Sequence, residues 1–310
     1  MSSDITINDK QDLKVSIGLP VYNGEKFLQE KIESLLKQTI KDFELIISDN
    51  ASTDSTSIIC QEYARKDKRI RYFKQEKNMG AIWNLKFVLE EAKSDYFAWT
   101  AADDVILPEF FEKNIKILDS RRNIVCSISQ VEHYGERTES LKPKSNDSLL
   151  TRLEKKIKRH YNYIAVYSAS GSYEKKLRYY LKRREGFQIF YGVYRTDVLR
   201  KSMISDHITG FDWLTILNVL KYGDFHVIEE ILMLRYDGGD SSSGLFNYAR
   251  SFNLSLLETI FPYGSFTIWC AKNLGAKLFL RNLDCFIKLG LDGVFYLGVD
   301  IVRMFIRKIK

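Results

Sequence analysis

Short apolar runs alternate with amphipathic segments through the first 130 residues. Strands are predicted where uninterrupted apolar runs end at polar or turn-forming residues, at 15–19, 43–48, 70–73, 96–100 and 124–131. Helices are predicted where apolar residues recur every three or four positions, at 28–36, from 54 onward, at 82–92 and from 108 to 118. Buried strands that alternate with helices are typical of a mostly parallel sheet with helices on its faces.

The pattern changes after residue 131. Residues 135–185 are polar, basic and rich in tyrosine, and we expect an insertion there. Apolar runs then predict a strand at 187–194, a helix at 211–220 and a strand at 225–236. A loop is predicted at 237–244, where Gly, Ser and Asp predominate.

The tail predicts an amphipathic helix. Its polar residues recur every three or four positions: Asp284, Lys288, Asp292, Asp300, Arg303 and Arg307. A bend is expected at Gly290, Gly293 or Gly298. The longest uncharged apolar run, 259–271, is shorter than the roughly 18 residues that cross a bilayer. Three alternatives remain open for the tail: packing on its own domain, on a second copy, or on a membrane surface.

Charge is concentrated in two regions. The net charge is +7; residues 152–184 hold eleven Lys and Arg against two Glu, and the tail after Lys272 is basic as well. A basic surface suits nucleic acid, anionic lipid or a phosphorylated substrate, and the alternative is a solvated face. The four cysteines are far apart without metal-site spacing, so we expect buried, reduced thiols and a reducing, cytoplasmic compartment.

Three polar clusters follow three of the predicted strands. They are Tyr22-Asn23, Asp49-Asn50 and Asp103-Asp104. Because ligands of open α/β sheets bind beyond the carboxyl ends of the strands, these clusters should converge into a site.

Four aspartates lie at positions that suit specific chemistry. The adjacent Asp103 and Asp104 suit a hard divalent cation with a diphosphate, although a capped turn is the alternative. Asp49 is either a hydrogen-bond acceptor for a base or ribose, or a helix cap. Asp212, at the start of a predicted helix, is either a helix cap or a general base.

Five ordered motifs make the chain resemble a known family. They are Val15–Gly24, Ser34–Thr39, Phe43–Asp54, Asn78-Met79-Gly80 with Asn84, and Ala102-Asp103-Asp104. This order is similar to that of the family 2 glycosyltransferases, which have the GT-A fold, and the likeness covers residues 14–120.

The resemblance implies roles for individual residues. The nucleotide-binding residues would be Pro20, Val21, Tyr22, Glu25, Asp49, Asn78, Gly80, Asn84 and Asp103. Asp49 would contact the base, usually uracil, and Asp103 the ribose or a metal-bound water. Asp104 would bind the divalent metal, manganese or magnesium, that bridges the diphosphate. Asp212 lies in a segment similar to the one that bears the catalytic base of the family.

The chain departs from the family pattern at two places. Ala101 stands where many relatives have an acidic residue, and residues 235–241 lack the histidine that many relatives carry there. Asp103, Asp237 and Asp240 are therefore the candidates for a further metal ligand, with water as the alternative.

The expected enzyme is an inverting, metal-dependent hexosyltransferase with a nucleotide-sugar donor, preferably a UDP-sugar. The expected acceptor is a saccharide or polyprenyl-linked saccharide of cell-surface polysaccharide synthesis, and no nucleic-acid partner is expected. Residues 152–184 and 284–310 would contact the inner face of the plasma membrane as a peripheral attachment, and the C-terminal helix could instead form a homo-oligomer. The expected GT-A domain spans 1–250, with a nucleotide-binding half (14–131), the insertion (135–185), an acceptor half (187–250) and a helical extension (251–310).

Two rival functions predict different features. A sugar-phosphate nucleotidyltransferase would have a glycine-rich, basic loop after the first strand, but residues 19–25 contain one glycine. An inactive, basic scaffold for membrane or nucleic acid would bind with a steep salt dependence and without metal.

Overall fold

The computed structural model of the chain describes residues 13–140, 166–182, 184–204, 208–238 and 260–309, together with 142, 144, 147, 148 and 152. The first half alternates strands and helices: β1 (Val15–Val21), α1 (Glu25–Leu36), β2 (Phe43–Asp49), α2 (Thr56–Lys66), β3 (Ile70–Lys74), α3 (Ala81–Glu90) and β4 (Tyr96–Trp99). This alternation confirms the predicted order of elements, and most boundaries agree within two or three residues.

The second half completes the sheet. Its elements are β5 (Val105–Ile106), α4 (Phe110–Ser120), β6 (Ile124–Tyr134), α5 (Glu136–Ser140), α7 (Tyr173–Lys182), the 3₁₀ helix η1 (Arg184–Tyr191), β7 (Val193–Arg195), α8 (Thr196–Ser202), α9 (Phe211–Val219) and β8 (Asp224–Tyr236). Three helices follow: α12 (Gly264–Asn273), α13 (Ala276–Arg281) and α14 (Leu283–Ile309).

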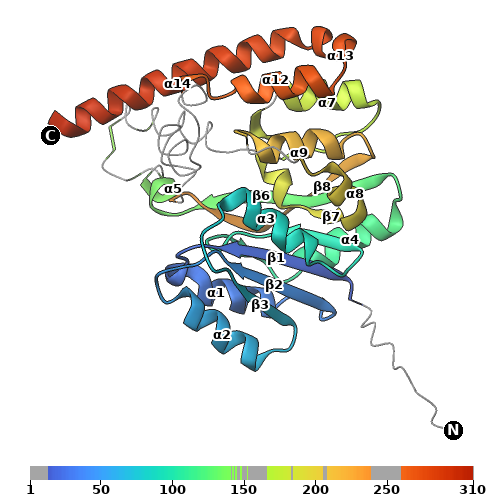
Figure 1. The fold of residues 1–310 in the computed structure, drawn as a ribbon, viewed down its shortest axis with the longest axis vertical. Helices are drawn as coiled ribbons and strands as arrows, with labels where there is room; N and C mark the ends of the chain where they lie inside the picture. The colour runs from blue at the N-terminus through green and yellow to red at the C-terminus, as the bar shows by residue number, and fades with distance from the viewer. Residues whose placement is uncertain are drawn as a thin grey trace.

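The strands form one eight-stranded sheet in the order β3-β2-β1-β4-β7-β6-β8-β5 (Figure 1). The strands β3, β2, β1 and β4 are parallel to one another, as are β6 and β8. The strands β7 and β5 are antiparallel to their neighbours. The prediction of a mostly parallel sheet flanked by helices, with a helical C-terminal extension, is confirmed.

The strand β1 is longer than predicted. Its pairing with β2 continues through Pro20 and Val21, where a turn was expected. Pro20 is tolerated because β4 pairs with β1 only as far as Gly18, so the missing N–H of Pro20 faces no ladder on that side. The turn therefore begins at Tyr22, and the strand carries its polar end further toward the site.

The predicted strand at 187–194 is wrong. Most of this segment is η1, and only 193–195 forms a strand, β7. Ile189 and Phe190 are adjacent and both buried, which the alternation of a strand with one buried face would not allow. The Phe190 ring stacks on Trp99, with ring centroids 4.4 Å apart. Packing against β4 therefore overrides the strand-like composition.

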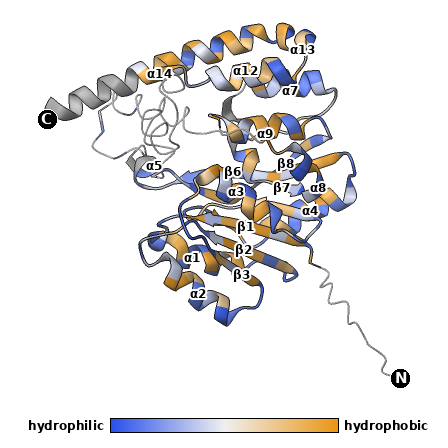
Figure 2. Ribbon diagram, viewed as in Figure 1, coloured by the Kyte–Doolittle hydropathy of each residue, from blue (hydrophilic) through white to orange (hydrophobic). Residues whose placement is uncertain are grey.

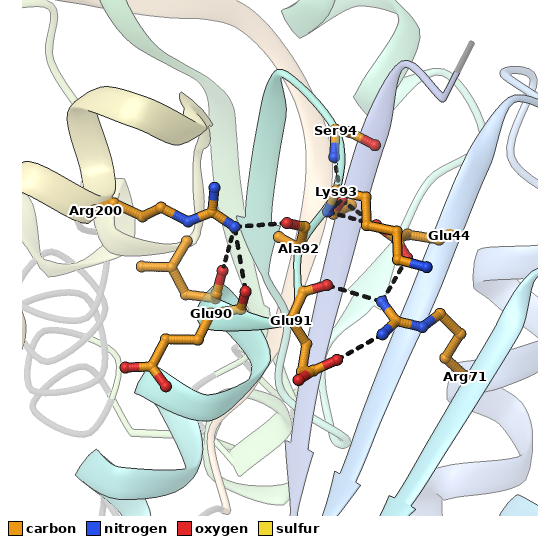
Figure 3. A network of polar contacts seen from close by, with 10 residues as sticks. Glu44, Arg71, Glu90, Glu91, Ala92, Lys93, Ser94 and Arg200 are labelled. Atoms are coloured by element: carbon orange, nitrogen blue, oxygen red, sulfur yellow. Dashed lines mark hydrogen bonds and ion pairs between the residues drawn. The ribbon is translucent and has the colours of Figure 1, made fainter. Parts of the chain in front are cut away.

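A polar network fixes the opposite end of the sheet from the predicted site (Figure 3). Arg71 of β3 pairs with Glu44 of β2 (2.8 Å) and with Glu91 (2.5 Å). Arg200 of α8 donates to the main-chain carbonyls of Glu90 (3.3 Å) and Ala92 (2.5 Å) at the end of α3. These bonds satisfy the exposed carbonyls of the helix end and hold the loop that leads into β4.

The C-terminal helices share the core of the sheet domain. Phe266 of α12 and Phe286 and Leu289 of α14 are buried in the same continuous cluster as the strands. In Figure 1 these helices form a layer beside α7 at one end of the molecule. One face of the tail thus packs on its own domain. The helix α14 runs unbroken through its three glycines, and none of the described helices combines the length and apolarity that crossing a bilayer requires.

The prediction of buried, reduced cysteines is confirmed. Cys60, Cys126, Cys270 and Cys285 are all free and buried. Burial raises the pKa of the Cys60 thiol to about 12, so this thiol stays neutral and unreactive.

Gly18 in the middle of β1 offers a test of this packing. A Cβ placed there would lie 2.7 Å from side-chain carbons of both Phe97 and Val88. We expect Gly18→Ala to lower the free energy of unfolding by about 1–3 kcal/mol through overpacking. Chemical denaturation measures the change.

Gly290 is the matched control, because it is exposed in α14 and a Cβ there meets no atom within 4 Å. Gly290→Ala should stabilise the protein by about 0.5–1 kcal/mol through helix propensity. Equal stability of the two variants would contradict the described packing of β1 against α3 and β4.

Candidate active site

The loops that follow β1 and β2 are bonded to each other. The Asn23 N–H donates to Ser52 Oγ (2.9 Å), and Asn23 Oδ1 accepts from the Thr53 N–H (2.9 Å). The Glu25 carboxylate accepts from the Ser55 N–H (3.0 Å) at the start of α2. Asn23 has a φ of 50°, a left-handed conformation that asparagine tolerates well. The predicted convergence of the first two polar clusters is therefore present.

The predicted nucleotide residues of β1 and β2 differ in accessibility. The Tyr22 side chain is 50% exposed, whereas Asp49 is fully buried. Asp49 Oδ1 accepts from the Ser52 N–H (2.8 Å), and Oδ2 accepts from the Tyr72 hydroxyl (3.0 Å). In this structure the Asp49 carboxylate holds the loop after β2, and the helix-cap alternative is wrong, because α2 begins only at Thr56 with Ser55 as its N-cap. Its contact with a base stays a prediction.

Asparagines hold the segment at the start of α3. Asn50 Nδ2 donates to Asn78 Oδ1 (2.9 Å), and Asn50 Oδ1 accepts from the Met79 N–H (2.9 Å). Gly80 adopts a φ of 87°, a region that glycine enters without steric cost. Asn84 Nδ2 donates to the Ser48 carbonyl (2.9 Å). Asn78, Gly80 and Asn84 thus lie at the carboxyl end of β2, and Asn50 of the second polar cluster holds the segment 78–79 there.

The register of β5 and β8 positions Asp104. Val105 pairs with Leu234 in antiparallel register, so Asp104 lies beside Arg235 at the end of β8. The Asp104 carboxylate is 2% exposed and accepts from the Tyr236 N–H (3.3 Å) through Oδ1. Its Oδ2 lies 3.4 Å from Arg235 Nε. The carboxylate is therefore enclosed by the end of β8.

Lys31 of α1 approaches the aspartate pair from within the core. It is 2% exposed, and its Nζ donates to the Asp104 carbonyl (2.8 Å). Burial lowers the pKa of Lys31 to about 8, and the charges of Asp104 and Asp103 act against that shift. At neutral pH Lys31 thus remains mostly protonated and offsets part of the charge of the pair.

Asp103 is more accessible than Asp104. Burial raises the pKa of Asp103, and the adjacent Asp104 carboxylate adds to the shift. The Tyr134 hydroxyl at the end of β6 donates to the Asp103 carbonyl (2.6 Å), and this fixes the backbone of the pair. A cation at the site would relieve the mutual repulsion of the two carboxylates.

Asp212 is the second residue of α9, a helix that begins directly after Gly210. Gly210 has a φ of 80°. Burial raises the pKa of Asp212, while its backbone hydrogen bonds and the charge of Arg235 act in the opposite direction. Burial also raises the pKa of Tyr191 to about 12, and the charges of Arg235, Asp104 and Asp212 all contribute to that value. Asp212, the aspartate pair and Arg235 therefore share one electrostatic neighbourhood.

The two remaining metal-ligand candidates are Asp237 and Asp240. The Asp237 carboxylate accepts from the Thr138 N–H in α5, and Asp240 lies outside the described residues. Among the residues that the structure describes, no three His, Cys, Asp or Glu side chains are grouped to hold a metal ion.

The aspartate pair nevertheless fits a divalent cation. Asp104 Oδ2 is buried and hydrogen-bonds to none of the described residues, and carboxylate oxygens are the ligands that manganese and magnesium favour. Asp104 and Asp103 are the residues that would hold such an ion.

Two basic site residues were missed from the sequence. Lys31 could have been predicted from the helical pattern. The buried face of α1 consists of Leu28, Lys31, Ile32 and Leu35, and a buried lysine requires an acceptor or a negative charge nearby. Arg235 is the penultimate residue of the strand predicted at 225–236, and it lies in the segment that lacks the expected histidine. Its pairing with Asp104 depends on the two-residue strand β5, which has no sequence signal of its own.

The comparison with known families decides the classification. The sequence matches the model of the family described as "Glycosyl transferase family 2" over residues 16–204, more than half of the chain. The chain belongs to this glycosyltransferase family.

Two curated relatives are similar over part of their length. An uncharacterized glycosyltransferase of Methanocaldococcus jannaschii is 38% identical over 130 residues, which are 41% of this chain and 45% of that protein. Glycosyltransferase GlyG of Streptococcus pneumoniae is 34% identical over 98 residues, 32% of this chain and 33% of GlyG. The matched part thus spans less than half of the length of these relatives.

Two solved structures confirm the GT-A fold for this family 2 chain. S. aureus TarS 1–349 in complex with UDP-GlcNAc has a TM-score of 0.55 at 17% identity, covering 90% of this chain and 82% of that one. The mannosyltransferase PcManGT from Pyrobaculum calidifontis, in complex with GDP-Man and Mn²⁺, has a TM-score of 0.55 at 14% identity, covering 94% and 74%. At these identities the likeness concerns the fold alone.

Proposed function

We propose that this glycosyltransferase is inverting and metal-dependent, and that it uses a nucleotide diphosphate sugar, preferably a UDP-sugar. The observation that carries the proposal is the common neighbourhood of the aspartate pair and Asp212 around Arg235. The pair suits the diphosphate end of a donor, and Asp212 suits the acceptor end.

The donor would lie across the carboxyl ends of β1, β2 and β4. The exposed Tyr22 side chain offers a stacking surface for a base, and Asn78 and Gly80, after the neighbouring strands, are exposed as well. Pro20 and Val21 at the end of β1 and Glu25 at the start of α1 would complete this nucleotide side. The printed complex of TarS with UDP-GlcNAc supports a UDP-sugar, and that of PcManGT with GDP-Man makes GDP the second nucleotide to test.

A divalent ion held by Asp104 and Asp103 would neutralise the charge that develops on the leaving diphosphate. Lys31 and Arg235 of this chain supply positive charge around the same carboxylates. Asp103 is the more accessible of the two and suits contact with ribose or a metal-bound water.

Asp212 would act as the general base. The acceptor oxygen attacks the anomeric carbon, its proton passes to the Asp212 carboxylate, and the bond to the diphosphate breaks with its electron pair going to the leaving group. A single displacement of this kind inverts the anomeric carbon. The raised pKa of Asp212 favours this role, because a higher pKa makes the carboxylate a stronger base than an ordinary aspartate.

Asp212→Asn should lower the rate of sugar transfer about 100- to 10,000-fold, because general-base assistance is lost. Donor affinity should stay near that of the wild type.

The pH dependence of the rate offers a second test. The wild-type rate requires ionised Asp212, and because its pKa is raised, the carboxylate becomes protonated at a higher pH than an unperturbed aspartate does. The acidic limb of the pH–rate profile should therefore lie at a higher pH than an unperturbed aspartate would give, and Asp212→Asn should lack it.

Asp197→Asn is the matched control, since Asp197 also lies in the first turn of a helix, α8, but is exposed and paired with Lys201 (3.2 Å). Its rate should equal that of the wild type. Transfer at the wild-type rate by Asp212→Asn would mean that another residue is the base.

For the acceptor, we propose a lipid-linked saccharide at an anionic membrane surface. The helix α14 packs with one face on its own domain and leaves an apolar stripe exposed. Hydrophobic and polar residues alternate along this helix in Figure 2. Its members are between 40% and 67% exposed: Leu283, Ile287, Leu291, Val294 and Phe295. An exposed apolar stripe on a basic amphipathic helix is the form that helices in a membrane interface take.

Charge favours lipid over a second copy as the occupant of this stripe. The segment from Lys272 to the end has eight Lys and Arg against three Asp, so two copies would repel each other, whereas anionic headgroups would attract the segment. Part of the basic 152–184 region serves the fold instead, because Lys176 pairs with Asp224 (3.0 Å) and Arg178 with Asp284 (2.9 Å).

The full-length protein should float with vesicles that contain phosphatidylglycerol and not with neutral vesicles. Leu291→Glu should weaken binding about tenfold or more, because it removes one apolar side chain that would enter the membrane interface and adds a charge that anionic headgroups repel. Ile58→Glu on α2, where the side chain is 61% exposed, should leave binding unchanged. Absence of vesicle binding, or a dimer that Leu291→Glu disrupts, would contradict the proposal.

A further inference from the structure

Arg235 and Asp104 form an ion pair that is incomplete as a hydrogen bond. Arg235 Nε lies 3.4 Å from Asp104 Oδ2, yet both atoms are buried and neither completes a hydrogen bond with any described residue. A buried charged atom that lacks a hydrogen bond is costly. Asp104 Oδ2 and Arg235 Nε therefore each have a bonding position that no described residue fills.

The position of Arg235 is well determined. The β5–β8 register sets it opposite Asp104, and the parallel β6–β8 register pairs it with His133. Its guanidinium lies over the Tyr191 ring, 4.6 Å from the centroid. Cation–π stacking of this kind orients the planar group while its N–H donors stay free to bond in the plane.

Arg235 also remains reachable from outside. Its side chain is 18% exposed, compared with 2% for Asp104, so it lies on the solvent side of the pair. A guanidinium binds phosphate oxygens through two parallel hydrogen bonds, a geometry that its single contact with Asp104 leaves unused.

We propose that Arg235 is a resident cation of the donor site, which balances Asp104 when no divalent ion is bound and binds the diphosphate of the donor directly. This inference rests on the proposed nucleotide-diphosphate donor. A divalent ion and Arg235 then compete for Asp104 Oδ2, and binding of the ion frees the guanidinium for the phosphates. The nucleotide should therefore keep part of its affinity in the absence of metal, because Arg235 binds its phosphates. The metal ion alone should bind weakly, because Arg235 competes with it for Asp104.

The test uses the full chain, with UDP and GDP titrated by calorimetry in EDTA, and Mn²⁺ alone titrated by electron paramagnetic resonance of the free ion. Arg235→Gln should weaken EDTA-resistant nucleotide binding about tenfold or more, because the phosphate contacts are lost. It should tighten binding of Mn²⁺ alone by at least about tenfold, because a like charge beside the ligand is removed. Wild-type values for both quantities would overturn the proposal.

Arg178→Gln is the matched control. It removes the same charge from a surface ion pair with Asp284, outside the site, and should change neither titration. A change in Arg178→Gln equal to that in Arg235→Gln would show an effect of net charge and would overturn the assignment to Arg235.

A variant of the partner residue, Asp104→Asn, tests the proposal if Arg235→Gln fails to fold. Asp104→Asn removes the partner carboxylate and leaves Arg235 in place. It should lose the metal-dependent part of nucleotide binding and keep, or increase, the EDTA-resistant part. Loss of both parts would overturn the role of Arg235.

Failure of the proposed function has a different signature. In that case the wild type itself would bind no nucleoside diphosphate, with or without Mn²⁺. Wild-type binding that Arg235→Gln leaves unchanged in EDTA would instead refute only the role of Arg235.

Discussion

A buried carboxylate needs positive charge close to it, and the site is built around that requirement at Asp104. The side chain is 2% exposed, with Arg235 beside its carboxylate and Lys31 bonded to its main-chain carbonyl. Lys31 comes from the first helix and Arg235 from the last strand of the sheet. The electrostatic balance of one residue therefore depends on the folding of both halves of the sheet domain.

The two halves contribute different parts of the site. The parallel strands β1, β2 and β4 bring their carboxyl ends together, and the mutual bonds between Asn23 and residues 52–53 fix the loops there. The second half adds Tyr134 and Tyr236 beside the aspartate pair, and Asp212 shares the electrostatic influence of Arg235 with that pair. The proposed function requires such a division into a donor side and an acceptor side.

Much of the fold followed from local pattern, because buried parallel strands are continuous apolar runs that a sequence displays openly. The polar ends of those strands likewise predicted Asp49, Asp103 and Asp104 as candidates, and the structure places them at or just after the ends of β2 and β4. The segment 187–194 was misjudged, since its aromatic residues resemble a strand and only the stacking of Phe190 on Trp99 selects a 3₁₀ helix.

The site contacts that could not be predicted from the sequence all join residues that are far apart in the chain. Lys31 lies in an amphipathic helix whose periodicity already marked it as buried, yet its partner is 73 residues away. The contact between Arg235 and Asp104 requires a strand of two residues, too short to carry periodicity. Asn50 supports the nucleotide segment only through bonds to Asn78 and Met79, which no local pattern predicts.

The central claim is that Asp104 gives this family 2 glycosyltransferase a metal-dependent nucleotide site. Calorimetric titration with UDP, GDP and dTDP, each with Mn²⁺ and then with EDTA, tests it most directly in the wild type and in Asp104→Ala. The account predicts that one nucleotide, UDP first, binds more tightly with Mn²⁺, and that Asp104→Ala abolishes this metal-dependent gain. Equal affinity with and without metal in the wild type, or an undiminished gain in Asp104→Ala, would contradict it.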